Sequence, residues 1–133
     1  MDPEKKPQVA DRHHQRILVV DDNRDAADTL SMLLEFLHYD VRTAYDGQQA
    51  LETAATFHPH LVILDINMPV MDGYQAARKL RGSKDAPRMV LMALTAVENA
   101  DSRNKAREAG FDMHLCKPVD GGELTGLIER ILH

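Results

Sequence analysis

Five short apolar runs alternate with segments of helical periodicity along this chain, and no other feature constrains its fold as strongly. The runs are "ILVV", "DVRTA", "LVIL", "MVLMAL" and "MHLC", and they begin at residues 17, 40, 61, 89 and 113. Their lengths are those of ordinary β-strands. Strands that alternate with helices form parallel sheets, because parallel strands need crossover connections, and these are nearly always right-handed. The alternation therefore predicts an α/β fold.

The segments between these runs have apolar residues at the spacing of helices that cover a sheet. Helices are predicted within 23–38 and 46–58, at about 73–80 and 98–109, and at about 122–132, with Asn23 as the first cap and Gly110 closing the fourth helix. The residues expected to face the sheet are Ala26, Leu30, Leu33, Leu34 and Leu37 in the first helix, Ala50, Leu51 and Ala54 in the second, and Leu124, Leu127, Ile128 and Ile131 in the last.

The character of each run indicates its place in the sheet. The runs at 17–20, 61–64 and 89–94 are apolar throughout, as expected of central strands that are buried on both faces. The run at 40–44 alternates and the run at 113–116 is more polar, so both suit edges. We therefore expect a flavodoxin-like (βα)5 doubly wound sandwich, with a five-stranded parallel sheet in the order 2-1-3-4-5. Ligands of such sheets bind outside the carboxyl ends of the strands, where the first and third strands lie side by side.

Residues 1–16 have two prolines, many charges and no apolar periodicity, so we expect a flexible N-terminal tail or linker before a single domain at 17–133. The net charge of -5 argues against direct binding of nucleic acid or of an anionic membrane. No apolar run approaches the roughly 20 residues that span a bilayer, and the polar N-terminus lacks the apolar centre of a signal peptide. A cytoplasmic location is predicted.

Polar residues follow four of the predicted strands at the same edge of the sheet. Asp21 and Asp22 follow the first strand, Asp65 the third, Thr95 the fourth and Lys117 the fifth. Three converging carboxylates would repel one another by about 4 kcal/mol per pair at about 4 Å and an effective dielectric constant of about 20. An all-oxygen set of this kind suits Mg²⁺, or Mn²⁺, held by carboxylates and waters. The sequence thus predicts a divalent metal site.

The other two polar residues complete a site for a phosphoryl group. The Thr95 hydroxyl and the Lys117 ammonium group are suitable partners for its oxygens. The metal and Lys117 together would offset the charge that develops during phosphoryl transfer. An aspartate can accept the group as an aspartyl phosphate. Asp65 is the best candidate because it stands alone at the end of a central strand, while the adjacent pair supplies charge for the metal.

The motifs "ILVVDD", "LVILDINMPVMDGYQ", "LMALTA" and "LCKPVD" resemble, in order and spacing, the receiver domains of two-component response regulators. The resemblance covers about Arg16 to Leu132 and includes the receivers of hybrid histidine kinases. It implies that Asp65 accepts a phosphoryl group from a phosphohistidine on a histidine kinase or histidine phosphotransfer protein. Phosphorylation would then switch the surface around strands four and five and control a downstream protein or a covalently linked domain.

The resemblance also assigns roles to individual residues. Asp22 would bind Mg²⁺ directly and Asp21 largely through water, with Asp65 and the backbone carbonyl of Asn67 as further ligands. Thr95 would hydrogen-bond the phosphoryl group and draw its loop inward, and Lys117 would form an ion pair with another phosphoryl oxygen. The bond between Lys117 and Pro118 is expected to be cis. The residues expected in the loops around the pocket are Met68, Pro69, Ala96 and Pro118.

The sequence departs from the family pattern at His114, three residues before Lys117, where receivers usually have Tyr or Phe as a side chain that swings inward on activation. Three interpretations stay open. The aromatic switch is muted, or it becomes sensitive to pH because imidazole titrates near neutrality, or His114 is an ordinary polar residue of an edge strand.

Two other functions compete with the phosphoacceptor hypothesis. A small aspartate-nucleophile phosphatase of the haloacid dehalogenase type would need a second acid two residues after its nucleophile, where this chain has Asn67. A receiver-like module that works without phosphorylation would be expected to have a degraded pocket. We therefore predict a signalling domain rather than an enzyme, with self-phosphorylation from small donors and slow autodephosphorylation as its own chemistry. A flavodoxin is disfavoured by the acidic first loop, "DDNRDA".

Overall fold

The fold is an alternating series of strands and helices. The computed structural model describes residues 15–68, 72–83, 89–96 and 99–132. Within them the elements are, in chain order, β1 (Arg16–Val20), α2 (Arg24–Phe36), β2 (Asp40–Ala44), α3 (Gly47–Phe57), β3 (Leu61–Asp65), α4 (Gly73–Arg81), β4 (Val90–Thr95), α5 (Ala100–Ala109), β5 (Met113–Cys116) and α6 (Gly121–Leu132). Of the tail predicted at residues 1–16, residues 1–14 lie outside the described residues. No described helix has the length and apolar character needed to cross a bilayer.

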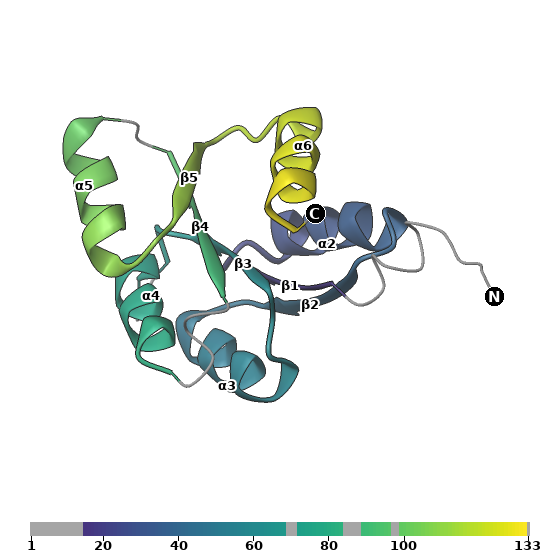
Figure 1. Cartoon of the computed structure of the whole chain (residues 1–133), viewed down its shortest axis with the longest axis horizontal. Helices are drawn as coiled ribbons and strands as arrows, with labels where there is room; N and C mark the ends of the chain where they lie inside the picture. The colour runs from purple at the N-terminus through teal and green to yellow at the C-terminus, as the bar shows by residue number, and fades with distance from the viewer. Residues whose placement is uncertain (1–14, 69–71, 84–88, 97–98, 133) are drawn as a thin grey trace.

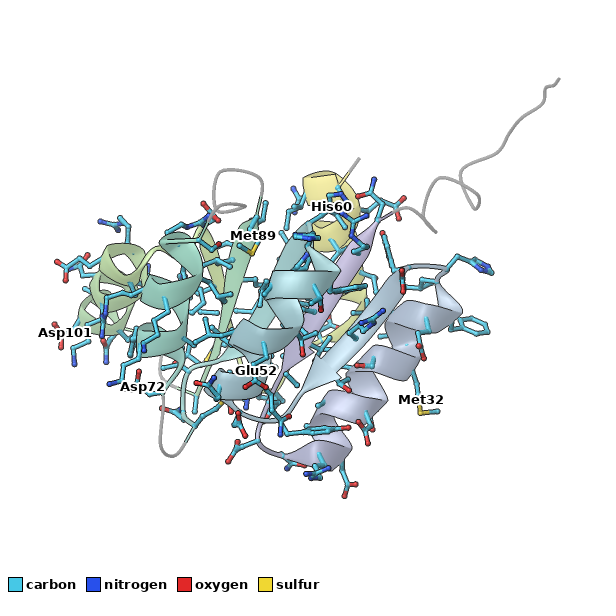
Figure 2. The ribbon with its side chains drawn as sticks, turned by 90° about the horizontal axis from the view of Figure 1, so that it is seen from below. Met32, Glu52, His60, Asp72, Met89 and Asp101 are labelled. Carbon is cyan, nitrogen blue, oxygen red and sulfur yellow. The ribbon has the colours of Figure 1, made fainter. Side chains whose placement is uncertain are left out.

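The strands form one parallel sheet in the order β2-β1-β3-β4-β5, which confirms the predicted flavodoxin-like topology. Helices α2 and α6 cover one face, while α3, α4 and α5 cover the other (Figure 1). Figure 2 shows His60 and Met89 at the amino-terminal edge of the sheet, with Asp72 at the opposite, carboxyl edge. The polar residues that follow the strands are thus collected on one side of the molecule.

The core has two layers because the central strands are buried on both faces. One cluster lies between the sheet and helices α2 and α6, and includes Ile63, Leu34 and Ile128. The other lies against α3, α4 and α5, and includes Leu18 and Leu80. Each such aliphatic side chain contributes roughly 1.5–3 kcal/mol by leaving water. The two layers hold β1 and β3 rigidly at the point where their carboxyl ends meet.

The prediction of the buried face of the first helix was partly wrong. Asn23 caps α2 as expected, since its side chain accepts a hydrogen bond of 3.1 Å from the Ala26 backbone. However, Ala26 and Leu33 are exposed, and the fully buried positions are Ala27, Ser31 and Leu34. The helix is rotated relative to the prediction, because Ala27 and Leu34, seven residues apart, are the side chains that pack on the sheet. Ala26 and Leu33 therefore lie on the side of the helix. That side lines a groove toward α6.

The remaining boundaries differ from the predictions by one or two residues. Asp65 and Thr95 are the last residues of β3 and β4 rather than the first residues after them. Helix α5 begins at Ala100 behind its cap, Asn99, and residue 98 lies outside the described residues. Gly110 ends α5 in the left-handed conformation, with a φ of 107°, which confirms its predicted role as a cap.

Candidate phosphorylation and metal site

The end of β3 presents Asp65 at the carboxyl edge of the sheet, next to the end of β1. The Asp65 side chain is only 4% exposed and that of Asp21 only 6%. Asp22 is exposed at the rim. The structure brings the three residues together, since a carboxylate oxygen of each lies within 4.8 Å of one from both others. Because β1 and β3 are paired neighbours, the sheet itself enforces this crowding.

Lys117 supplies a positive charge to this cluster from the end of β5. Its Nζ lies 3.3 Å from Asp65 Oδ1 and 3.6 Å from Asp21 Oδ2. The Lys117 backbone N–H donates a 2.7 Å hydrogen bond to the Thr95 carbonyl, which ties the ends of β5 and β4 together. The ammonium group therefore contacts two of the three carboxylates from a fixed piece of backbone.

Backbone N–H groups hold the two buried carboxylates in place. The N–H of Asn67 donates to Asp65 Oδ1 at 3.2 Å, and the N–H of Asn23 donates to Asp21 Oδ1 at 3.0 Å. Gly73, the first residue of α4, packs directly on the Asp65 peptide. A Cβ there would lie 2.6 Å from Ile66 Cα and 2.7 Å from the Asp65 carbonyl oxygen. A glycine is required here because the backbones approach closely, and it lets α4 begin against the end of β3.

Burial raises the pKa of Asp65, and the neighbouring Asp21 carboxylate raises that pKa further. Lys117 and the Asn67 N–H oppose this effect without cancelling it. The carboxylate form is thus under-compensated by the protein's own groups. Three carboxylates that offer hard oxygen ligands within a few ångströms fit a Mg²⁺ or Mn²⁺ ion, whose charge would make up the deficit.

The other predicted pocket residues surround Asp65 in different ways. Thr95 is buried at the end of β4, and Ala96 beside it is exposed. Met68 is buried after β3, whereas Asn67 is exposed. Pro118 follows Lys117 through a cis peptide bond, as the family resemblance implied. Pro69 lies outside the described residues. The positions of these residues agree with the expected pocket, while their roles in binding remain predictions.

His114 lines a cavity that includes none of the three clustered aspartates. It lies on β5 opposite Ala93 of β4, and its side chain lines a separate cavity of about 200 Å³ between α5 and β5. The structure therefore places this residue against helix α5, on the same strand as Lys117 but further from the carboxyl edge.

Sequence reasoning missed a contact that fixes the first turn of α2 beside the site. The Arg24 guanidinium stacks over the Tyr45 ring at 4.2 Å from its centroid, and the Tyr45 hydroxyl donates a 2.6 Å hydrogen bond to Asp28. These residues connect α2 to the loop after β2. Apolar periodicity carries no signal for such a contact, because none of the three residues belongs to the core pattern.

Residues 17–129 match the family model of the response regulator receiver domain. The chain therefore belongs to this family of two-component signalling domains. Its relatives include response regulator MprA of Mycobacterium tuberculosis, 38% identical over 117 residues, and transcriptional regulatory protein PrrA of the same organism, 40% identical over 118 residues. Each match covers 88% of this chain, and 50% and 49% of the respective relative. The chain thus spans about half the length of these relatives.

Solved structures give the same result for the fold. Chemotaxis protein CheY4 of Vibrio cholerae matches with a TM-score of 0.84 and 27% identity, over 88% of this chain and 98% of that one. The receiver domain of sensor histidine kinase PA1611 from Pseudomonas aeruginosa matches with a TM-score of 0.80 and 32% identity, over 89% and 97%. The latter has a magnesium ion coordinated in its active site cleft.

Proposed function

We propose that this domain accepts a phosphoryl group on Asp65 in a Mg²⁺-dependent reaction, with a phosphohistidine on a histidine kinase or histidine phosphotransfer protein as donor. The observation that carries the proposal is the arrangement around one buried carboxylate: Lys117 at 3.3 Å and two further carboxylates within 4.8 Å. Few other reactions need an aspartate crowded by acids and paired with a lysine at the edge of a parallel sheet.

In the proposed transfer, an Asp65 oxygen attacks phosphorus and forms the acyl phosphate bond while the phosphorus–nitrogen bond of the donor breaks. The electron pair of that bond stays on the imidazole, which takes a proton from solvent. Lys117 offsets the charge on the phosphoryl oxygens, and the Thr95 hydroxyl at the end of β4 hydrogen-bonds one of them. A bound Mg²⁺, held by Asp21, Asp22, Asp65 and the Asn67 carbonyl, would supply further charge neutralisation.

The signal would leave the site through the ends of β4 and β5. The Lys117 N–H and the Thr95 carbonyl are joined at 2.7 Å, so movement of either side chain toward a phosphoryl group shifts both strand ends. The surface of these strands would then change its affinity for a partner. The partner is a linked domain or a separate protein, and the first arrangement accords with relatives of which this chain spans about half the length. A cytoplasmic location accords with a kinase as donor.

The proposal is tested by incubating the domain with Mg²⁺ and acetyl phosphate and measuring its intact mass. We expect a gain of one phosphoryl group in wild type, none in Asp65→Asn, and none after chelation of the metal. Asp72→Asn, which removes a half-buried carboxylate outside the cluster, is the matched control and should be phosphorylated normally. An equal mass gain in Asp65→Asn, or no gain from acetyl phosphate or a phosphohistidine donor, would contradict the proposal.

A phosphatase would give a different result in the same assay. It would release phosphate continuously from small phosphate esters, because a second acid assists each turnover. Here position 67 is an asparagine whose backbone N–H is already bonded to Asp65. We therefore expect a single stoichiometric phosphorylation followed by slow loss of phosphate, without sustained turnover of esters.

A further inference from the structure

An arginine follows the carboxylate cluster closely in the chain but does not pair with it. Arg24 is the first residue of α2, two positions after Asp22, and both side chains are exposed. Its guanidinium lies over the Tyr45 ring, 4.2 Å from the centroid, and forms no ion pair with any carboxylate of the residues that the structure describes. Asp22 has no cationic partner among those residues either, because the ion pairs of Lys117 go to the other two carboxylates.

The Tyr45 ring is held in place by several contacts. Its hydroxyl donates a 2.6 Å hydrogen bond to Asp28, and its backbone N–H donates to the Gln49 side-chain oxygen at 2.9 Å. The preceding residue, Ala44, is tied to the site, since its carbonyl accepts a 3.2 Å hydrogen bond from the Asp21 backbone N–H. The ring also packs against the core layer beneath α2. The fold thus fixes an aromatic surface for Arg24 next to the carboxylate cluster.

Electrostatics within α2 gives Arg24 no other strong partner. A cation in the first turn of a helix opposes the helix dipole. Asp28, four residues later, would form an ion pair in the less favourable order along the helix, and its carboxylate already accepts the Tyr45 hydroxyl. A guanidinium released from the ring would therefore be attracted to the carboxylates of the site, where Asp22 is the nearest in the chain. There it would compete with a divalent cation.

We propose that the Tyr45 ring holds the Arg24 guanidinium away from the carboxylate cluster and so keeps Asp22 available to the divalent cation. The inference rests on the proposed Mg²⁺-dependent function and adds two positioning residues to it. The ring and the cation then have opposite effects on metal binding. Loss of the ring weakens binding only while Arg24 is present, whereas loss of Arg24 does not weaken it. A stack that merely stabilised the loop would make both substitutions harmful, because each removes the same contact.

The test is a calorimetric titration of the full chain and its variants with Mg²⁺. Tyr45→Ala should weaken binding about fivefold, the size expected of one exposed ion pair that must be broken. Tyr45→Phe, which keeps the ring without its hydroxyl, should stay within about twofold of wild type. Arg24→Ala should bind at least as tightly as wild type, and the double variant Arg24→Ala/Tyr45→Ala should bind like Arg24→Ala. Such a rescue also shows that the fold survives loss of the ring.

The second cation–π pair of the domain supplies the matched control. The Arg42 guanidinium lies over the Phe57 ring, 4.7 Å from the centroid, and neither residue belongs to the carboxylate cluster. Arg42→Ala removes the same charge as Arg24→Ala, so it should not restore Mg²⁺ binding to Tyr45→Ala. A spectroscopic readout accompanies the titration: the Arg24 side-chain Nε–H resonance should be insensitive to Mg²⁺ in wild type. In Tyr45→Ala it should shift as the metal displaces the guanidinium.

Three outcomes would overturn the inference: wild-type affinity in Tyr45→Ala, a double variant as weak as Tyr45→Ala, or equal rescue by Arg42→Ala. The mass assay with acetyl phosphate tests the proposed function separately. If wild type is phosphorylated on Asp65 and Tyr45→Ala binds Mg²⁺ normally, the proposed function stands and this inference falls. If Arg24→Ala restores Mg²⁺ binding but no phosphorylation occurs, the inference stands and the phosphoacceptor proposal falls.

Discussion

The two edges of the sheet handle charge in opposite ways. At the carboxyl edge, Asp21, Asp22 and Asp65 crowd together, Lys117 forms ion pairs with Asp21 and Asp65, and burial raises the pKa of Asp65. At the amino-terminal edge, polar groups are matched one by one. The first arrangement costs stability and is ready to bind a cation, whereas the second contributes stability and needs no ligand.

The amino-terminal edge has its central cation at Arg81, at the end of α4. The guanidinium donates to the Gly110 carbonyl at 2.8 and 3.0 Å, to the Met89 carbonyl at 2.8 Å, and to the Asp112 carboxylate. It therefore joins α4, the start of β4 and the turn before β5. The two edges thus differ: the carboxyl edge holds crowded negative charge, whereas the amino-terminal edge pairs its cation with one carboxylate and two carbonyls.

The largest expected effect is stabilisation by a divalent ion, which would remove the contrast between the edges. A ligand that binds only the folded state at 100 times its dissociation constant adds about 2.7 kcal/mol. Saturating Mg²⁺ should therefore raise the free energy of unfolding of wild type by about this amount in urea denaturation. Asp22→Asn should lose most of the increment, because it removes an exposed carboxylate of the cluster.

Asp25→Asn is the control for this experiment. Asp25 is exposed and acidic like Asp22, but it lies in the first turn of α2 outside the three-carboxylate cluster. Its substitution should leave the Mg²⁺ increment unchanged. If Asp22→Asn and Asp25→Asn lose the same fraction of the Mg²⁺-dependent stabilisation, general screening of negative charge explains the effect better than a bound ion does.

The second-largest effect concerns Arg81 at the amino-terminal edge. Arg81→Ala should lower the free energy of unfolding by about 2 kcal/mol, because it removes hydrogen bonds to two carbonyls and leaves Asp112 without its cation. Arg81→Lys should recover only part of the loss, since an ammonium group cannot reproduce the guanidinium fork. Urea denaturation measures both. Equal stability of wild type and Arg81→Ala would show that this edge does not compensate for the other.

The carboxyl edge was predictable from the sequence for a physical reason that the amino-terminal edge lacks. Strand order follows from apolar runs and crossover rules, and in a parallel sheet the order alone decides that Asp21, Asp65, Thr95 and Lys117 share an edge. The rotation of α2 about its axis was harder to predict from the sequence, because Leu33 fits an apolar helical stripe as well as Ala27 does. Packing of α2 on the sheet decided between them, and no local pattern encodes that contact.

The contacts of Arg81 and the cavity beside His114 could not have been found in this way. Arg81 lies 29 residues from Gly110 in the sequence. Its role depends on the guanidinium group of α4 reaching the carbonyl at the end of α5, a contact that only the folded chain makes. The sequence did indicate that His114 is unusual, but only relative to the family pattern. Its neighbours, Arg103 and Arg107, looked like ordinary charges of a solvated helix until the fold placed β5 against α5.

A smaller effect is expected from neutralising the acceptor itself. In the absence of divalent ions, Asp65→Asn should raise the free energy of unfolding by about 1 kcal/mol at neutral pH, since it relieves burial and repulsion from Asp21. The sign follows from linkage. An acid whose pKa is raised by folding binds protons more tightly in the native state, so wild type regains stability as pH falls. The difference in the free energy of unfolding between Asp65→Asn and wild type should therefore become smaller from neutral to acidic pH.

Urea denaturation with a chelator, at neutral and mildly acidic pH, measures this difference. Asp72→Asn is again the comparison, because it removes a half-buried carboxylate that caps α4, and it should change stability little since Asn caps helices about as well as Asp. If Asp65→Asn proves less stable than wild type at neutral pH, the ion pair with Lys117 outweighs burial, and the carboxyl edge is not strained.

The smallest effect should come from His60, which joins the starts of β1, β3 and β4 at the matched edge. Its Nδ1 accepts a 2.9 Å hydrogen bond from the Arg16 backbone N–H, and the backbone N–H of His60 donates to the Arg16 carbonyl at 2.8 Å. Burial lowers the pKa of His60, and the Arg16 charge lowers that pKa further. The native state thus favours the neutral imidazole.

Protonation of Nδ1 would remove this acceptor, so the sign is opposite to that for Asp65. A base whose pKa is lowered by folding contributes stability above its unfolded pKa of about 6.5, and this is lost as pH falls toward the folded pKa. We expect wild type to lose a few tenths of a kcal/mol relative to His60→Asn over this window, because the Asn oxygen still accepts but does not titrate. If the free energies of unfolding of wild type and His60→Asn change with pH in parallel, the hydrogen bond from the Arg16 N–H to His60 adds nothing to stability. The amino-terminal edge would then depend on Arg81 instead.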